Sequence, residues 1–343
     1  MAWEHVPQLI QWDITSRCNL ACLHCRATNL EEIKGDDLSF EQIAGILEQI
    51  KALSPQATLA LAGGEPMFRK DLKDILYYVK NNIPEMNTEI LSNGTLINPD
   101  NIGWLTETVN GFNISLEGAS AEINDSIRGK GAFDKTVQGL IMLLEKNASV
   151  SVRMTFFHQH EDEPEKLMRF IAEMGIKGFN FRYLVPVGRA CNQSISSDQY
   201  KRLCERIWHL GKELGVRVGF SDPFPELLIN KEREQEIMDD SDLLNGTSVT
   251  GCSIAFTLLY INPKGHVYFC PYFPVYVADS STGDLKKIWF ENETFNSFRR
   301  HRYLLKGKCG KCEFKFACGG CRGAAHAFGD FLEEEPRCWK QVV

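Results

Sequence analysis

The sequence has no apolar run long enough to cross a membrane and no excess of basic residues. Its 343 residues carry a formal net charge of −7, which argues against a general nucleic-acid surface because such surfaces are normally basic. Residues 1–15 lack the basic start and the long apolar stretch of a signal peptide. We therefore expect a cytoplasmic protein that contacts neither membrane nor nucleic acid.

Several common catalytic signatures are also missing. The chain contains no phosphate-binding loop, no dinucleotide-binding fingerprint and no serine–histidine–acid motif. Internal repeats and low-complexity segments are absent as well. With 43% apolar residues, the chain is long enough for one large domain, or for one large and one small domain.

Strand-like apolar runs alternate with amphipathic segments from residue 8 to about residue 186. This alternation predicts a parallel sheet with helices outside it. The six runs are 9–15, 57–62, 87–92, 111–116, 149–156 and 178–185. Between the first two, residues 39–54 have helical spacing, and Ser39 with Gln42 forms a capping box. We expect an α/β fold with a partial (β/α)6 parallel barrel, and 216–220 is a weaker strand candidate.

Composition divides the chain into three parts. Residues 1–221 hold the predicted barrel, and 222–250 are charged and predicted to form a helix and a linker. Residues 251–343 are rich in cysteine, glycine and aromatic residues, with a hairpin signal at 263–265. We expect a small α+β domain there, and a small cysteine-rich domain usually depends on bound metal for its stability.

Cysteines are missing between residues 25 and 191 but crowd both ends of the chain. Three of the twelve lie in residues 18–25, and seven follow residue 250. Because cytoplasmic thiols stay reduced, these clusters indicate metal or redox chemistry. Cys204 lies at helical spacing in an amphipathic segment, so we expect it in the core as a small hydrophobic residue.

The first cluster, Cys18, Cys22 and Cys25, has the spacing C-x3-C-x2-C and follows the first predicted strand. Three thiolates can hold three irons of a cubane iron–sulfur cluster and leave the fourth iron open to a ligand. Loops that follow the strands of parallel α/β folds are also where ligands bind. The alternative is a zinc site completed by His24 or by a distant residue.

This motif, with His24 before its last cysteine, resembles that of the radical S-adenosylmethionine (radical SAM) enzymes. The resemblance continues in "GGEP" (63–66), "SNGT" (92–95), "ISLEG" (114–118, usually with aspartate at the position of Glu117) and "IRGKGAF" (127–133). It implies a [4Fe–4S] cluster on the three cysteines, with S-adenosylmethionine bound beside it. The implied cofactor contacts are His24, Gly63, Gly64, Glu65, Ser92, Asn93, Ser115, Arg128 and Val185.

The later cysteines resemble the seven-cysteine SPASM extension of these enzymes, which holds two auxiliary [4Fe–4S] clusters. Its spacings are C-x12-G-x4-C over 252–270 and C-x2-C-x5-C-x2-C over 309–321, and Cys338 closes the series. The resemblance implies one cluster on Cys309, Cys312, Cys318 and Cys338, and a second on Cys252, Cys270 and Cys321 with an unassigned fourth position. Three clusters are therefore expected in all. Taken alone, 309–321 also fits a four-cysteine zinc site.

Cys191 follows the sixth predicted strand and is a candidate fourth ligand or catalytic thiol, with a plain loop cysteine as the alternative. His158 and His160 follow the fifth strand and are either surface residues or part of the substrate pocket. Glu161 and Asp162 beside them are candidate acid–base groups, with the same alternative.

Arg153 and Arg182 lie in the fifth and sixth predicted strands and are candidates to face the barrel interior. A buried arginine needs an anion, so a substrate carboxylate or the cofactor is the expected partner.

The family resemblance implies that a flavodoxin or ferredoxin supplies an electron, and that S-adenosylmethionine is cleaved to a 5′-deoxyadenosyl radical. This radical takes hydrogen from the substrate, and we expect a net oxidation. Residues 18–27 and 318–338 resemble enzymes of haem biosynthesis, which favours side-chain removal or decarboxylation of a tetrapyrrole. One alternative is maturation of a ribosomally made peptide with a separate recognition protein, since only residues 1–8 precede the first strand. The other is a non-enzymatic iron–sulfur electron-transfer protein.

Overall fold

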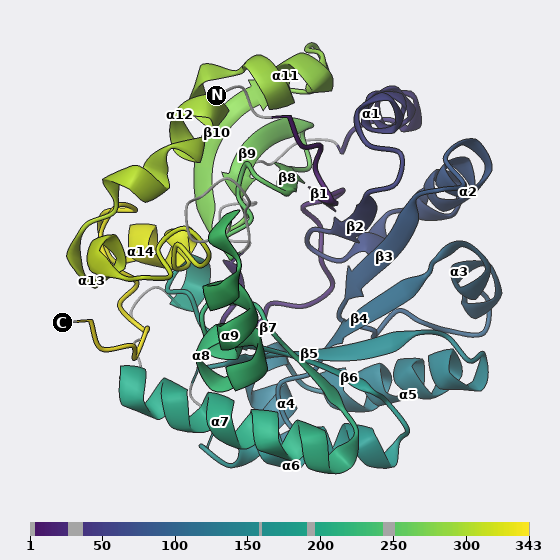
Figure 1. The fold of residues 1–343 in the computed structure, drawn as a ribbon. Helices are drawn as coiled ribbons and strands as arrows, with labels where there is room; N and C mark the ends of the chain where they lie inside the picture. Colours follow the sequence, from purple (N-terminus) through teal and green to yellow (C-terminus); the bar gives the residue numbers. More distant parts are fainter. Residues whose placement is uncertain (1–3, 27–36, 158–159, 191–195, 243–250, 343) are drawn as a thin grey trace.

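The computed structural model describes residues 4–26, 37–157, 160–190, 196–242 and 251–342. These residues contain a ten-stranded sheet with the strand order β10-β9-β8-β1-β2-β3-β4-β5-β6-β7. The sheet curls around a central region and helices cover its outer side (Figure 1). The predicted α/β fold with a partial parallel barrel is therefore confirmed.

Strands β1 to β7 pair in parallel, each with the next one in the chain. Their bounds are β1 Leu9–Asp13, β2 Thr58–Ala62, β3 Asn87–Ser92, β4 Gly111–Ser115, β5 Val150–Phe156, β6 Gly178–Tyr183 and β7 Arg217–Phe220. The outer helices are α1 Phe40–Leu53, α2 Leu72–Asn82, α3 Ile102–Thr108, α4 Ala121–Arg128, α5 Ala132–Glu145, α6 Glu163–Glu173 and α7 Ser197–Leu214. All six predicted strand regions form strands, and the weaker candidate forms β7.

The C-terminal part of the chain continues the same sheet. Strand β8 (Leu258–Ile261) pairs in parallel with β1, and β9 (His266–Cys270) and β10 (Phe273–Asp279) follow it antiparallel. The predicted hairpin turn is confirmed, with Gly265 at φ 78° and Asn262 Oδ1 accepting from two backbone N–H groups of the turn. The free edge of β1 is thus covered by residues that differ from the barrel in composition.

Alternation along each strand separates the core from the interior of the curled sheet. On β5, Val152, Met154 and Phe156 are buried in the core, while Arg153 and Thr155 between them are only partly buried. Because successive side chains of a strand point to opposite faces, these two residues face the central region.

Helix α1 shows why the predicted elements form where they do. Ser39 Oγ accepts from Gln42 N at 3.3 Å and Ser39 N donates to Gln42 Oε1 at 2.9 Å, which completes the predicted capping box. Ile43, Leu47 and Ile50 are buried against the sheet, so apolar burial on one face stabilises the helix.

The sequence predicts a helix and a linker over 222–250. The structure has two short helices within 222–242, and residues 243–250 lie outside the described residues. The remaining helices are α8 Pro225–Ile229, α9 Lys231–Asp239, α11 Leu285–Glu291, α12 Glu293–Arg299, α13 Gly307–Lys311 and α14 Arg322–Ala327, with short 3-10 turns η2 Pro66–Phe68, η3 Gly188–Ala190 and η4 His301–Leu304. Leu227 and Ile237 pack with Phe314 and Ala317, which joins α8 and α9 to the C-terminal part. None of the helices in the described ranges is long and apolar enough to span a membrane.

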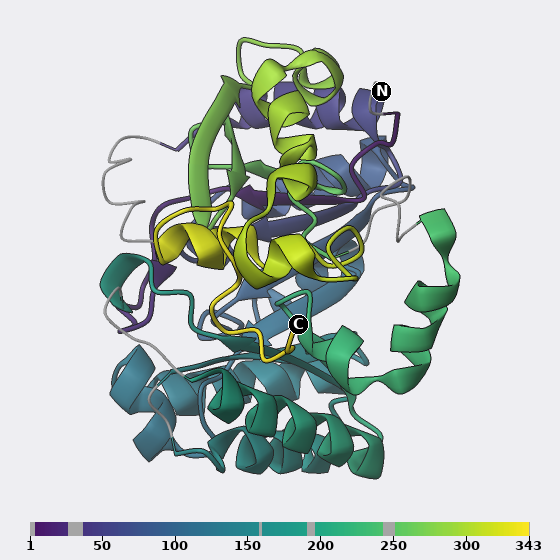
Figure 2. The ribbon, with the colours of Figure 1, turned by 60° about the vertical axis from the view of Figure 1, so that its left-hand side comes forward.

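A buried ion pair fastens the end of the chain to the last strand of the barrel. Arg337 donates to both oxygens of Asp222, at 2.8 and 3.2 Å, and Tyr200 Oη donates to Asp222 at 2.7 Å. Glu335 Oε1 accepts from Arg337 Nε at 2.8 Å. Figure 2 shows the yellow C-terminal segment descending onto the teal part of the chain that includes α7, where Trp339 contacts the ring of Tyr200.

This cluster is fully buried, so its charges depend on one another. Burial favours the neutral form of Asp222, but Arg337 and Arg182 outweigh it and hold the pKa of Asp222 below its ordinary value. The carboxylate is therefore ionised, and removal of its partner leaves a charge without compensation.

We expect Arg337→Met to lower the free energy of unfolding by about 3–5 kcal/mol, because it leaves the carboxylates of Asp222 and Glu335 buried without their cation. The measurement is denaturant unfolding of anaerobically purified protein, with Arg169→Met as control because the Arg169 side chain is 54% exposed. If Arg337→Met lowers the free energy of unfolding no more than the control does, the buried ion pairs of Arg337 do not fasten the end of the chain.

Candidate functional site

The cysteine-bearing loop after β1 lies directly against the loop after β2. Gly64 N donates to Thr15 O at 2.9 Å and Glu65 N donates to Arg17 O at 2.8 Å. A Cβ on Gly63 would lie 2.3 Å from Thr15 O, and one on Gly64 would lie 2.2 Å from Arg17 O. Side chains do not fit at these distances, so close backbone approach requires both glycines.

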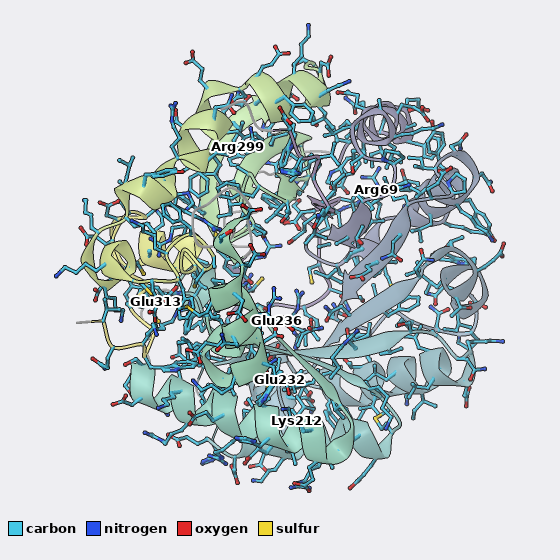
Figure 3. The ribbon with its side chains drawn as sticks, in the orientation of Figure 1. Arg69, Lys212, Glu232, Glu236, Arg299 and Glu313 are labelled. Carbon is cyan, nitrogen blue, oxygen red and sulfur yellow. The ribbon has the colours of Figure 1, made fainter. Side chains whose placement is uncertain are left out.

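Arg69 fixes the base of the same loop from the other side. It is buried, and its guanidinium donates to Ile14 O at 3.0 Å, to Leu38 O, and to Asp71. Figure 3 labels Arg69 in the part of the fold where β1, β2 and α1 meet. Sequence reasoning missed this residue because nothing in its spacing marks a contact 55 residues back in the chain.

Cys18, Cys22 and Cys25 share one short loop, with Cys18 exposed and the other two partly buried. Burial raises the pKa of Cys18 to about 11, and it also raises the pKa of Cys22 although Arg128 opposes the shift. A thiol with a raised pKa carries its proton at neutral pH, whereas a coordinating metal removes that proton. Leu20 N donates to Cys18 Sγ at 3.4 Å, as backbone amides do to cluster sulfurs. The loop therefore fits a bound iron–sulfur cluster.

Glu65 joins this loop to the end of β3. Its carboxylate is buried and accepts from Ser92 Oγ at 2.8 Å, from Asn93 N at 2.7 Å and from Met67 N at 3.2 Å. Asn93 Nδ2 in turn donates to Asn19 Oδ1 at 3.0 Å, inside the cysteine loop. The structure thus brings together Glu65, Ser92 and Asn93, three of the expected cofactor contacts.

Glu117 occupies the centre of a second polar cluster at the ends of β4 and β5. Its Oε1 lies 3.1 Å from His24 Nε2 and 2.7 Å from Arg128 Nη2, and its Oε2 accepts from Thr155 N at 2.7 Å. Burial alone would raise the pKa of Glu117, but His24 and Arg128 reverse the effect and lower it to about 2. The glutamate in the position usual for aspartate is therefore an ionised anchor for His24 and Arg128.

The other expected cofactor contacts lie at neighbouring strand ends. Ser115 ends β4, and Val185 is buried just after β6. From the turn beyond Val185, Arg189 donates through N to Cys25 O and through Nη1 to Cys22 O, both at 3.1 Å. Contact of Ser115 and Val185 with a cofactor stays a prediction.

Four cysteines of the C-terminal part line one pocket. They are Cys309, Cys312, Cys318 and Cys338. Cys309 Sγ accepts from Glu335 N at 3.3 Å, and Cys318 Sγ accepts from Gly320 N at 3.4 Å. Burial raises the pKa of Cys338 to about 11, so this thiol is protonated at neutral pH unless a coordinating metal removes its proton. This grouping matches the set predicted to hold one complete cluster.

The second predicted set is more dispersed along the fold. Cys252 and Cys270 are buried near one another, and burial raises the pKa of Cys270 to about 12. Cys321 N donates to Glu335 Oε2 at 3.1 Å, and the same carboxylate accepts from Arg337. Cys191, the candidate fourth ligand or catalytic thiol, lies outside the described residues. Within the described ranges, no three His, Cys, Asp or Glu side chains are grouped as for a single metal ion.

The remaining candidates do not join either site. His160 is exposed, and His158 lies outside the described residues. Glu161 accepts from Gln199, and Asp162 pairs with Lys166 at 2.8 Å. Cys204 is fully buried in α7, as expected of a core residue.

Comparisons with known families match both parts of the chain. Residues 12–171 match the radical SAM superfamily, and residues 252–313 match the SPASM iron–sulfur cluster-binding domain. Together they imply iron–sulfur clusters and S-adenosylmethionine binding.

Individual relatives extend over nearly the whole chain. An AdoMet-dependent heme synthase of Methanosarcina barkeri is 29% identical over 98% of this chain and 98% of its own length. Mycofactocin maturase MftC of Mycolicibacterium smegmatis is 28% identical over 97% of this chain and 82% of its own. The crystal structure of Streptococcus suis SuiB bound to precursor peptide SuiA has a TM-score of 0.79 at 17% identity, covers 98% of this chain and 76% of that one, and supports the fold.

We expect Gly64→Ala to lower the rate of S-adenosylmethionine cleavage about 100-fold, because the new Cβ displaces the cysteine loop from the β2 loop. The measurement is 5′-deoxyadenosine formed by reconstituted protein with dithionite. Gly45→Ala is the matched control, since a Cβ on Gly45 in α1 meets nothing within 4 Å. If Gly64→Ala and Gly45→Ala cleave S-adenosylmethionine at equal rates, the site does not depend on the close contact between the loops after β1 and β2.

Proposed function

Because the chain belongs to the radical SAM superfamily and carries a SPASM domain, we propose that it oxidatively removes a carboxylate-bearing side chain, or its carboxylate, from a tetrapyrrole. The observation that carries this proposal is the similarity to an AdoMet-dependent heme synthase, which runs end to end in both chains. In a reaction of this kind the cofactors supply the radical chemistry, and the protein binds and orients the substrate.

The residues of the N-terminal site have separate tasks in this proposal. Cys18, Cys22 and Cys25 hold a [4Fe–4S] cluster. When bound, this cluster supplies the electron that cleaves S-adenosylmethionine to methionine and the 5′-deoxyadenosyl radical that takes hydrogen from the substrate. Glu117 holds His24 and Arg128 in position.

The C-terminal cysteines hold two auxiliary [4Fe–4S] clusters in this proposal. The pocket set of Cys309, Cys312, Cys318 and Cys338 accounts for one. Cys252, Cys270 and Cys321 account for the other. A flavodoxin or ferredoxin would supply the electron from outside, and the auxiliary clusters, when bound, would provide a place for the electron that the substrate radical gives up.

We expect anaerobically reconstituted protein to contain about twelve irons, and the double variant Cys309→Ala/Cys312→Ala to contain about eight, because one cluster loses two ligands. Iron, zinc and sulfide are measured per chain. Cys204→Ala is the control, since this buried cysteine lies in the core of α7 and is outside both sets. Stoichiometric zinc, or an unchanged iron content in the double variant, would count against three clusters.

Maturation of a ribosomally made peptide is the second candidate, favoured by the similarity to mycofactocin maturase. A protein that only relays electrons is not retained, because the chain is a radical SAM enzyme by its family and relatives.

We expect the reconstituted enzyme, supplied with dithionite, S-adenosylmethionine and iron coproporphyrin III, to release carbon dioxide and to convert propionate into vinyl groups. Each event breaks one carbon–carbon bond, passes one hydrogen atom to the deoxyadenosyl radical and releases one electron. Porphyrin mass and 5′-deoxyadenosine are followed together by mass spectrometry. If deoxyadenosine accumulates with the porphyrin unchanged, while a peptide with its recognition protein is modified, the maturase function replaces this one.

A further inference from the structure

Two arginines on neighbouring strands face the interior of the curled sheet. Arg153 lies opposite Asn180, and Thr155 lies opposite Arg182, so the two arginines are one same-face step apart on β5 and β6. Both belong to the inward-facing rows of their strands, while the adjacent Val152 and Phe181 are buried in the core. The fold therefore brings two guanidinium groups to one interior surface.

Among the described residues, no carboxylate is hydrogen-bonded or ion-paired to either arginine. Arg153 makes no hydrogen bond and no ion pair with any residue in the described part of the chain, and the Nε atoms of both arginines are buried without a partner. The guanidinium of Arg182 lies over the ring of Tyr272, 3.9 Å from its centroid. Buried polar groups of this kind are costly unless something in the interior pairs with them.

The neighbouring charges do not fill this role. Asp13 accepts from Arg26 with both oxygens, at 3.0 Å each, and from Tyr260 Oη at 2.7 Å. Glu117 holds His24 and Arg128. The pKa of Arg153 is lowered, by burial first and then by Arg182 and Arg26, although Tyr272 opposes the shift. Burial would lower the pKa of Arg182, but Tyr272 and then Asp222 outweigh burial and raise it. The carboxylate of Asp222 is itself hydrogen-bonded to Arg337 and Tyr200. The interior is therefore short of negative charge at Arg153, and the carboxylate that acts on Arg182 is already held by other residues.

We propose that Arg153 and Arg182 bind carboxylate groups of the substrate inside the curled sheet. Arg153 lies close enough to Glu117 for an electrostatic interaction, and Arg182 lies similarly close to Cys321. A carboxylate bound by both arginines thus lies between the N-terminal site and the auxiliary cysteines. Guanidinium groups bind carboxylates in planar, bidentate geometry, which orients the substrate as well as holding it. The identity of that substrate as a propionate-bearing tetrapyrrole rests on the proposed function.

The test is equilibrium binding of iron coproporphyrin III to the reconstituted holoenzyme under anaerobic conditions, followed by the porphyrin absorbance. We expect Arg153→Gln and Arg182→Gln each to raise Kd about 10- to 100-fold, as expected for loss of a charge-assisted hydrogen bond. Arg153→Lys keeps the charge but not the bidentate geometry, so its Kd lies between wild type and Arg153→Gln. Arg169→Gln on the exposed face of α6 is the matched control, and iron content verifies that each variant is folded.

A second ligand separates a carboxylate site from a general loss of binding. Wild-type protein should bind the tetramethyl ester of iron coproporphyrin III more weakly than it binds the acid. Arg153→Gln should discriminate less between acid and ester than wild type does, and the double variant Arg153→Gln/Arg182→Gln should discriminate least. Equal losses for acid and ester in the variant, or variants that bind the acid as tightly as wild type does, overturn this inference and leave the proposed function standing. Loss of S-adenosylmethionine binding with unchanged porphyrin affinity assigns the arginines to the cofactor and also overturns it. Wild-type protein that binds neither porphyrin overturns the inference together with the proposed function.

Discussion

The contact on which the site depends is the backbone approach between the loops that follow β1 and β2. Two amide-to-carbonyl hydrogen bonds join them at distances that leave no room for a Cβ on Gly63 or Gly64. This approach places Glu65, whose buried carboxylate then fixes the end of β3 through Ser92 and Asn93. The ends of β1, β2 and β3 are therefore held in place around the cysteine loop by a series of contacts that depends on glycine at positions 63 and 64.

Charge pairing extends this order into the interior. Glu117 and Asp222 each hold a buried arginine, and Asp13 holds the partly buried Arg26. Each of the three carboxylates lies at or just beyond the end of a strand. Such pairs contribute little net stability, because desolvation offsets most of the attraction, but they fix orientation and make the loss of one partner costly. Among the described residues, no carboxylate is hydrogen-bonded to Arg153 or Arg182, which is why we propose these two residues, and not the paired ones, as the site for an incoming anion.

The sequence predicts the local features well and the distant contacts poorly. Strand runs, the capping box at Ser39 and the cysteine spacings all have short-range periodic or motif signals, and the structure confirms the strands and the cap. The links Arg69 to Ile14, Tyr260 to Asp13 and Arg337 to Asp222 join residues 55, 247 and 115 positions apart. No spacing rule encodes such pairs, because they exist only once the sheet has formed. The pairing of β8 with β1 could not be predicted for the same reason. The composition of residues 251–343 differs from that of the barrel, although backbone hydrogen bonds join the two parts in one sheet.

The C-terminal segment acts on both edges of the parallel part of the sheet. Its strand β8 covers β1, and Arg337 fastens it to Asp222 after β7. Glu335 links this brace to the cysteines, since its carboxylate holds Arg337 and accepts from Cys321 N while its own N–H donates to Cys309 Sγ. Residues that contact both edges of the parallel sheet thus also adjoin the pocket lined by Cys309, Cys312, Cys318 and Cys338. We therefore expect a metal bound in this pocket to stabilise the ion pairs of Arg337, because ordering Cys309 and Cys338 for a metal also orders Glu335, which accepts from Arg337.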